Sequence, residues 1–238
     1  MPETFTSATL LQDRLDTITA NTRRLVQAER LAISEQATAD LFATGIEDRL
    51  LPVGSTAPSF SLPDALTGKP VSSADLLALG PLVINFFRGR WDPYCVTELE
   101  AWRDLFPDLR RTGALLVAIS PQTNRQNDFT VQQHGLRYPL LADAGAVLAG
   151  QYGIGYSLPE TSRRYYRSIL INIPFNNSGA GYERATEESW RLPLPATIVV
   201  AQDNTIAFAE AYADPRVRPE PSEVFKVLAS LPLKDSHI

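Results

Sequence analysis

The stretch that decides the fold is Phe86-Phe87-Arg88-Gly89-Arg90-Trp91-Asp92-Pro93-Tyr94-Cys95-Val96-Thr97-Glu98-Leu99. An apolar run over 82–87 leads into it, and a helical pattern over 98–111 leads out of it. These patterns predict a buried strand, a tight turn and a helix that opens at the only cysteine of the sequence. Unpaired N–H groups and the helix dipole favour a thiolate at such a position, and the two arginines of the turn add positive charge. A free cysteine elsewhere usually packs in a core, so this setting makes Cys95 a candidate reactive thiol.

The composition is that of an ordinary globular protein. The sequence has 238 residues, of which 44% are hydrophobic and 21% charged, with a formal net charge of −5. This balance indicates no nucleic-acid partner, and the lack of an apolar run of 18 residues indicates no membrane partner. One cysteine excludes an internal disulfide, and with two histidines a metal site is not expected either. The first residues lack a secretory pattern, so we expect a cytoplasmic protein. We also expect no cofactor.

The chain divides into an N-terminal helical arm over 1–49 and a main domain over 50–238. Residues 8–49 contain no Gly or Pro before Gly45 and carry apolar residues at helical spacing. Thr6 or Ser7 is expected to cap this helix, and a break over 19–22 to split it. Because the apolar stripe needs a partner, the arm should pack on the main domain or on a second subunit. We therefore expect a homodimer.

Strands and helices alternate through the main domain, which predicts a mainly parallel sheet covered on both faces. Gly113 and Gly135 are expected to end two of the helices, and Ser73 to cap another. An insertion over 156–192 is expected to hold a helix over 160–166, a strand over 168–173 and an irregular loop over 176–181. The remaining expected strands are 59–64, 82–87, 114–119, 139–142, 197–201 and 205–209, and the remaining expected helices are 74–79, 98–111, 124–134, 146–152 and 222–231.

This order of elements resembles a thioredoxin fold, and three motifs resemble its peroxiredoxin branch, the AhpC/TSA family. The motifs are Gly54-x-x-Ala57-Pro58-x-Phe60-x-Leu62, Phe86-Phe87-Arg88-Gly89-x-Trp91-x-Pro93-Tyr94-Cys95-x-x-Glu98-Leu99 and Leu192-Pro193-Leu194-Pro195-Ala196. The resemblance covers about residues 50–232. It implies an α/β fold of the thioredoxin type, with a central mixed β-sheet flanked by helices, to which the arm is an N-terminal extension.

The resemblance also implies a thiol-dependent peroxidase of the one-cysteine type. Such an enzyme reduces hydrogen peroxide or organic hydroperoxides through a sulfenic acid on Cys95. With no second cysteine, an external thiol, either small or thioredoxin-like, would resolve the sulfenic acid. The resemblance implies Cys95 as the nucleophile and Glu98 as the acidic residue three positions after it. From the charges of the turn, Arg88 or Arg90 would lower the thiol pKa, and Arg88 and Asp92 complete the candidate catalytic residues.

Departures from the family pattern concern Arg88, which stands where the family has Pro, then Asp92 and a missing arginine. Asp92 stands where the family has Thr and the subgroup has a second cysteine. Its charge would raise the thiol pKa, although in a pair with Arg88 or Arg90 it could orient an arginine or accept the proton; a plain turn role before Pro93 is the alternative. Pro195, which resembles the cis-proline of thioredoxins, lies near the place of the family's arginine. Arg191, Arg167 or Arg90 could substitute for that arginine, and the expected substrate pocket comprises Arg90, Trp91, Pro93, Tyr94, Pro195 and Arg191.

Two other functions fit the same residues. A degenerate thioredoxin-fold protein with a binding or regulatory role would have a slow thiol and an interface formed by the arm and the insertion. A monothiol disulfide oxidoreductase would use Cys95 against a disulfide, although monothiol enzymes generally keep the first cysteine of the turn.

Overall fold

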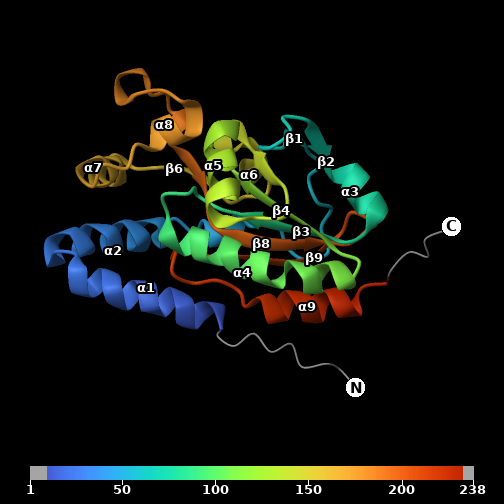
Figure 1. Cartoon of the computed structure of the whole chain (residues 1–238). Coiled ribbons are helices and arrows are strands. Elements are labelled where there is room, and N and C mark those ends of the chain that lie inside the picture. Colours follow the sequence, from blue (N-terminus) through green and yellow to red (C-terminus); the bar gives the residue numbers. More distant parts are fainter. Residues whose placement is uncertain (1–9, 233–238) are drawn as a thin grey trace.

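A five-stranded mixed sheet forms the centre of the molecule in the computed structural model, which describes residues 10–232 (Figure 1). Its strand order is β5-β4-β3-β8-β9. β3 runs parallel to β4, and β4 parallel to β5, whereas β8 is antiparallel to both of its neighbours. The last hairpin therefore makes the sheet mixed, as the resemblance implied, rather than mainly parallel. The strands are β3 Leu82–Phe86, β4 Leu115–Ser120, β5 Leu140–Ala142, β8 Ala196–Val200 and β9 Ile206–Ala211.

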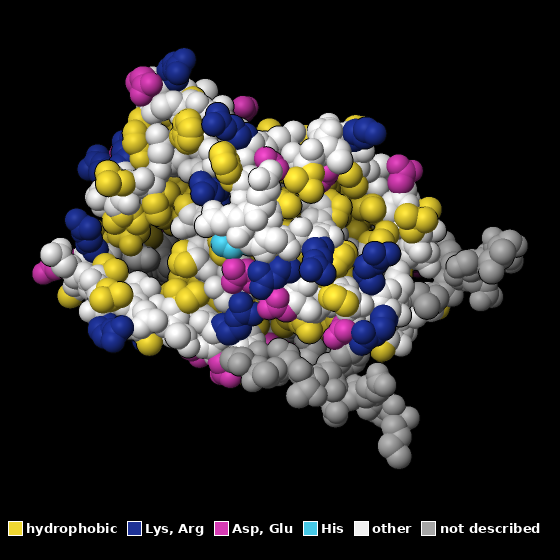
Figure 2. Space-filling model, in the orientation of Figure 1, with side chains coloured by type: hydrophobic (Ala, Val, Ile, Leu, Met, Phe, Trp, Pro, Cys, Tyr) yellow, Lys and Arg dark blue, Asp and Glu magenta, His cyan; other side chains and the backbone are white. Residues whose placement is uncertain are grey.

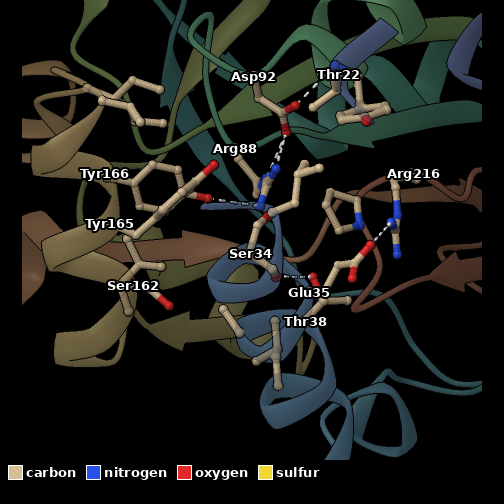
Figure 3. Close-up of a pocket in the computed structure, with 18 of the residues that line it drawn as sticks. Thr22, Ser34, Glu35, Thr38, Arg88, Asp92, Ser162, Tyr165, Tyr166 and Arg216 are labelled. Carbon is tan, nitrogen blue, oxygen red and sulfur yellow. Dashed lines mark hydrogen bonds and ion pairs between the residues drawn. The ribbon is translucent and has the colours of Figure 1, made fainter. Parts of the chain in front are cut away.

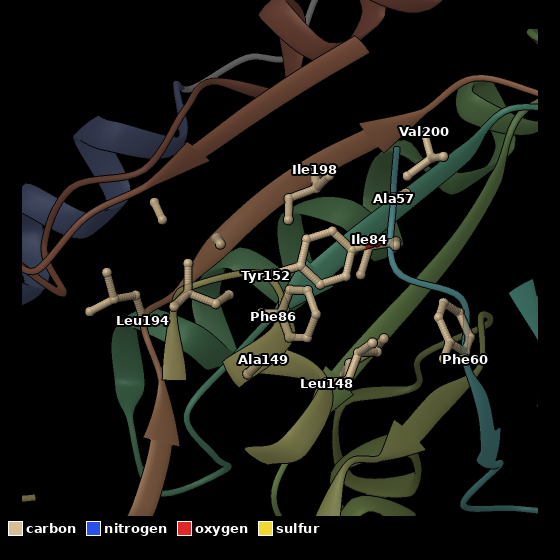
Figure 4. Packing of buried hydrophobic residues seen from close by; sticks show 14 of the residues in the cluster. Ala57, Phe60, Ile84, Phe86, Leu148, Ala149, Tyr152, Leu194, Ile198 and Val200 are labelled. Carbon is tan, nitrogen blue, oxygen red and sulfur yellow. The ribbon is translucent and has the colours of Figure 1, made fainter. Parts of the chain in front are cut away.

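Helices cover both faces of this sheet, because alternate residues of its strands enter two separate cores. Phe86 packs on one face with Tyr152, whose ring centroid lies 5.4 Å away (Figure 4). Phe87 packs on the other face with Trp102 and Phe225, which come from two helices. The helices α3 and α6 contribute to the first core, and α4, α5 and α9 to the second. Their bounds are α3 Ser73–Leu79, α4 Pro93–Arg111, α5 Asn124–His134, α6 Val147–Gln151 and α9 Pro221–Ser230.

Caps and turns set the ends of these elements. Helix α4 begins five residues earlier than its apolar pattern indicates, because Asp92 caps it and a proline occupies its first turn. Helix α5 ends at Gly135, which is left-handed (φ 59°), as predicted. Ser72, and not Ser73, caps α3; Ser73 instead accepts a hydrogen bond from Phe60 N (3.0 Å), next to the hairpin β1 Ser61–Pro63 and β2 Pro70–Ser72.

The arm is a pair of helices, α1 Leu11–Leu25 and α2 Ala28–Ala43, followed by a 3-10 turn over Glu47–Arg49. The break lies at Val26 and not over 19–22, where the Thr19 hydroxyl bonds back to a carbonyl one turn earlier and stays compatible with a helix. Leu11 and Leu15 pack against α4 of the same chain, so the arm docks on the main domain. The expected caps, Thr6 and Ser7, lie outside the described residues.

Between its two closing strands, the insertion is built from short helices and turns. The antiparallel strands β6 Gly155–Ser157 and β7 Arg191–Pro193 close its base, and between them lie α7 Glu160–Ser168, α8 Ile173–Ser178 and two 3-10 turns over 182–184 and 188–190. The strand predicted over 168–173 is wrong, because Leu170 is left-handed (φ 62°) and Asn172 caps α8. Because Asn172 caps α8, the first half of the loop expected over 176–181 is also helical.

Charged side chains of both signs are interspersed on the face shown in Figure 2. Among residues 10–232, no helix has both the length and the apolar character needed to cross a membrane.

Candidate active site

Three chain segments meet at one edge of the central sheet. In register, Phe86 at the end of β3 faces Ala196 at the start of β8, which faces Ala211 at the end of β9. The turn over 87–92, the residue before β8 and the loop after β9 therefore converge at the same edge.

Cys95 lies in the first turn of α4, and its side chain is fully buried. Its sulfur donates a hydrogen bond to Asp92 Oδ2 at 3.0 Å. The other oxygen of the same carboxylate accepts from Tyr94 N at 3.0 Å, which is the N-cap bond of the helix. Asp92 is therefore both a helix cap and the hydrogen-bond acceptor of the thiol.

Arg88 pairs with Asp92 across the turn. Its Nε and Nη2 lie 2.7 and 2.6 Å from Asp92 Oδ2. The guanidinium also lies 5.2 Å from the centroid of the Trp91 ring and 3.5 Å from the Tyr166 hydroxyl, which accepts from it (Figure 3). Burial opposes the ionisation of Asp92, but Arg88 and then Arg218 outweigh it and lower the Asp92 pKa.

Arg218, in the loop after β9, is the arginine that contacts the sulfur. Its Nη2 lies 3.6 Å from Cys95 Sγ, and its side chain is fully buried. It was not among the arginines that the sequence suggested, all of which precede the last hairpin. Only the order of the strands could have indicated Arg218, because the chain after β9 lies at the edge of the sheet where β3 ends.

Glu98 anchors Arg218 beneath the sulfur. Its Oε2 accepts from Arg218 Nε at 2.6 Å, and its Oε1 accepts from Asn85 Nδ2 at 2.7 Å and Thr197 Oγ1 at 3.2 Å. Burial raises the pKa of Glu98, although Arg218 acts in the opposite direction. Thr197 of β8 is therefore a partner of this buried pair.

These groups favour a neutral thiol. Burial and then the negative charge of Asp92 raise the pKa of Cys95 to about 12, while Arg218 and Arg88 lower it. Both effects that the sequence suggested for Asp92 are thus present, because it orients an arginine and also disfavours the thiolate.

A cavity of about 210 Å³ opens beside this site, between the arm, the insertion and the turn (Figures 2 and 3). Asp92 and Arg88 form part of its wall, whereas Cys95 lies behind them and does not line it. Of the expected pocket residues, Trp91, Pro93 and Tyr94 line it. The rest of the wall is mixed. Its apolar and aromatic part comprises Leu31 and Leu41 of α2, Tyr165 and Tyr166 of α7, and Leu158, Ile169 and Ile171, and its polar part includes Ser34, Glu35, Thr38 and Arg216.

The other expected site residues lie apart from this cavity. The guanidinium of Arg90 approaches Gln126 and Gln133, both at 3.4 Å, and that of Arg167 lies over the rings of Tyr182 and Trp190. Arg191 lies in β7, near Gly150.

Pro195 is buried at the sheet edge where β8 begins. No cis peptide bond occurs among residues 10–232, so Pro195 has the trans form that most X–Pro bonds adopt and differs from the expected cis-proline. No group of three potential metal ligands occurs in the same part of the chain.

Comparisons with known proteins identify relatives of this chain and a shared fold. The chain is 35% identical over 101 residues to a Mycobacterium tuberculosis protein named "Putative peroxiredoxin Rv1608c", which covers 42% of this chain and 65% of that protein, slightly less than two thirds of its length. It is 30% identical over 129 residues to peroxiredoxin Q of Sedum lineare, which covers 52% of this chain and 68% of that protein. The crystal structure of peroxidoxin BcpB from Mycobacterium tuberculosis superposes with a TM-score of 0.57 and 22% identity over 77% of this chain and 99% of that one, which shows a shared fold.

The family model described as "AhpC/TSA family" matches residues 53–209, which include the β3–α4 turn, Cys95 and most of the central sheet. The arm and the Arg218 loop lie outside the matched residues. The chain therefore belongs to the AhpC/TSA family and is a peroxiredoxin-like protein with a thioredoxin fold.

Proposed function

We propose that this chain is a one-cysteine thiol peroxidase in which Cys95 attacks the peroxide. The observation that carries the proposal is the placement of Arg218, a permanent positive charge 3.6 Å from the sulfur in the first turn of α4. A guanidinium and a helix N-terminus together stabilise the thiolate and the charge that develops on a departing oxygen. Membership of the AhpC/TSA family supports this reading.

The reaction balances without a cofactor. The Cys95 thiolate attacks the terminal oxygen of ROOH, so that an S–O bond forms as the O–O bond breaks. The departing alkoxide takes up a proton equivalent to the one that the thiol released, which gives Cys95–SOH and ROH. One molecule of an external thiol, R′SH, then condenses with Cys95–SOH to give a mixed disulfide and water, and a second attacks that disulfide to release the reduced Cys95 thiol and the disulfide R′SSR′. The thiol must come from another molecule because the sequence has no second cysteine.

We propose an organic hydroperoxide as the substrate. The cavity of about 210 Å³ is far larger than hydrogen peroxide needs, and the apolar and aromatic part of its wall fits a carbon skeleton. Its wall at Arg88 and Asp92 is the part closest along the hydrogen-bond network to Cys95.

Because Cys95 is fully buried, a small thiol suits the resolving step better than a protein thiol does. Such thiols are kept reduced in the cytoplasm, which is the compartment that we propose. We also propose a homodimer, which light scattering coupled to size-exclusion chromatography would test. The exposed Leu25 and Phe42 of the arm favour such self-association.

Intact-mass measurement tests the activity most directly. After a brief exposure to cumene hydroperoxide with an acid quench, the wild-type chain should gain the mass of one oxygen, and Cys95→Ser should gain none. Steady turnover should then require an added thiol. A wild-type chain that is unchanged, or that is modified as fully when Cys95 is Ser, would overturn the proposal.

A second candidate is a binding protein that does not turn over. The observation in its favour is the buried thiol, whose pKa is raised to about 12, beside a cavity built by the arm and the insertion. Asp92→Asn separates the two candidates, because it removes the charge that most strongly opposes the thiolate apart from burial. If that variant also resists oxidation, the binding role is the better account. Burial of the sulfur also weighs against attack on protein disulfides, as a monothiol oxidoreductase would require.

A further inference from the structure

The loop that carries Arg218 is fastened to the helical arm. The Glu220 carboxylate accepts hydrogen bonds from the backbone N–H groups of Leu11 (3.0 Å) and Gln12 (2.8 Å), which open α1. The Gln12 side chain donates to the backbone oxygen of Arg216 at 3.0 Å. Helix α1 has no side-chain cap from its own N-cap residue, so Glu220 supplies the cap from more than 200 residues away in sequence.

Two further contacts extend this attachment. Arg216 lies 3.8 Å from Glu35 of α2, and Glu47, in the 3-10 turn after α2, accepts from Ala213 N at 2.6 Å. The arm thus contacts the loop over 213–220 at both of its helices and at the turn that follows them.

Within the loop, the orientation of the Arg218 guanidinium depends on the loop backbone. Its Nη1 donates to the carbonyl oxygens of Pro215 (2.8 Å) and Val217 (2.7 Å), while Nη2 reaches Cys95. A shift of the backbone would therefore move the charge relative to the sulfur.

The segment between Arg218 and Glu220 is stiff. It reads Arg218-Pro219-Glu220-Pro221, and the two prolines fix their own φ and restrict the residues before them to extended conformations. Glu220 has φ −67° and ψ 136°, as expected before a proline. A movement of the Glu220 backbone should consequently move Arg218 by a similar distance.

We propose that Glu220 is a positioning residue that, by capping α1, ties the arm to the loop and holds Arg218 at the Cys95 sulfur. The effect on peroxide reduction rests on the proposed function, whereas the effect on the thiol itself does not. Arg218 is the strongest of the groups that lower the Cys95 pKa, so its displacement should leave less thiolate at any given pH.

The test compares Glu220→Ala with Arg14→Ala. Arg14 also ties α1 to the main domain, through Glu100 at 3.5 Å, but it does not touch the loop. Each variant is assayed for Cys95 oxidation by cumene hydroperoxide and for alkylation by iodoacetamide at pH 8. Glu220→Ala should lower both rates about tenfold, which corresponds to one pKa unit, and Arg14→Ala should leave both within about twofold. Glu220→Gln, which keeps one acceptor oxygen, should recover part of the loss.

A double-mutant cycle shows whether Glu220 acts through Arg218. In a background with the buried pair neutralised, Arg218→Gln with Glu98→Gln, Glu220→Ala should have no further effect. Equal losses with and without Arg218, equal losses in Glu220→Ala and Arg14→Ala, or faster alkylation in Glu220→Ala would each overturn the proposal. If the neutralised background does not fold, the comparison of Ala, Gln and the Arg14 control decides. If no variant reacts with hydroperoxide, the peroxidase proposal fails, and alkylation alone decides the role of Glu220.

Discussion

At the scale of single residues, the chemistry depends on how one carboxylate is shared. Asp92 accepts the Cys95 S–H, the Tyr94 N–H and two bonds from Arg88. Arg88 and then Arg218 hold it ionised against the effect of burial, and the resulting negative charge, together with burial, keeps the neighbouring thiol protonated. A neutral residue at this position would remove that charge while leaving Arg218 beside the sulfur.

Asp92→Asn should therefore activate the thiol. We expect its rate of alkylation by iodoacetamide at pH 7 to rise by about tenfold or more, since one pKa unit changes the thiolate fraction tenfold. The variant should also be less stable by about 3–5 kcal/mol, because Arg88 loses its buried partner. Asp75→Asn, an exposed acid in the first turn of α3, is the matched control and should change neither quantity. A slower thiol in Asp92→Asn would show that Asp92 promotes the reaction.

The pH dependence of the wild-type thiol follows from the same contacts. With the Cys95 pKa raised to about 12, the thiol is almost entirely neutral at pH 7, and the thiolate fraction rises with pH. Alkylation should accelerate about tenfold per pH unit between pH 7 and 10, whereas a free cysteine levels off near its pKa of about 8.5. Rates measured against a cysteine-containing peptide check this expectation. A plateau of the protein rate near pH 8 would contradict it.

The sequence could indicate Cys95, Asp92, Arg88 and Glu98 because all four lie within one turn and helix start, where local rules for capping and helix dipoles apply. Arg218 lies outside such rules. Its place depends on the register of β3, β8 and β9, which brings the end of the last strand to the cysteine. Local sequence patterns do not show how β3, β8 and β9 pair, so they could not predict the position of Arg218.

At the scale of secondary-structure elements, the insertion and α2 matter because together they build the cavity. Thr38 of α2 and Tyr165 of α7 both line it, so its shape depends on how these two helices pack. Glu98 and the loop carbonyls hold Arg218 beside Cys95, and the pair that α2 makes with this loop, Glu35 with Arg216, involves neither Thr38 nor Tyr165. Changes in this region should therefore alter the choice of peroxide rather than the reactivity of the thiol.

Thr38→Trp tests this separation by filling the cavity from α2. We expect the oxidation rate with cumene hydroperoxide to fall by about fivefold or more, because the bulky substrate loses its apolar contacts, while hydrogen peroxide reacts within about twofold of the wild-type rate. Ala39→Trp places the same side chain on an exposed position of the same helix and should change neither rate. Equal losses for both peroxides would argue against a binding role for the cavity.

Elements of the central domain could be predicted closely from sequence, whereas those of the insertion could not. The apolar run of β3 and the pattern of α5, which ends at a left-handed glycine, each carry a strong local signal. In the insertion, Leu170 adopts a left-handed conformation that non-glycine residues rarely take, and its apolar neighbours resemble a strand. The break expected over 19–22 is wrong as well, because the Thr19 hydroxyl bonds back to the Leu15 carbonyl and α1 continues to Leu25.

At the scale of the whole molecule, the two hydrophobic cores of the sheet are larger than the cluster that joins α1 to the main domain. Two large clusters lie on opposite faces of the sheet. Helix α1 docks through a separate small cluster of Leu11, Leu15 and Ala101, while Leu41 and Ile46 of the arm pack on the first large cluster. The family match begins at residue 53, after the arm. The main domain should thus keep its fold when the arm is released, although the site would lose the contacts that hold the Arg218 loop.

Leu15→Ala and Phe86→Ala should distinguish docking of the arm from folding of the main domain. Both side chains are fully buried, but Phe86 belongs to a core of the sheet and Leu15 to the cluster under the arm. Phe86→Ala should lower the free energy of unfolding in urea by about 3–5 kcal/mol, as a cavity in a large core does. Leu15→Ala should instead increase hydrogen exchange in α1 and α2 and lower the free energy of unfolding of the main domain by less than about 1 kcal/mol, because local undocking precedes global unfolding. It should also slow Cys95 oxidation, since an undocked α1 no longer engages Glu220. An equal loss of global stability in Leu15→Ala and Phe86→Ala would mean that the arm and the main domain unfold as one unit. The arm would then be part of the folded core, and not a separate element that holds the Arg218 loop.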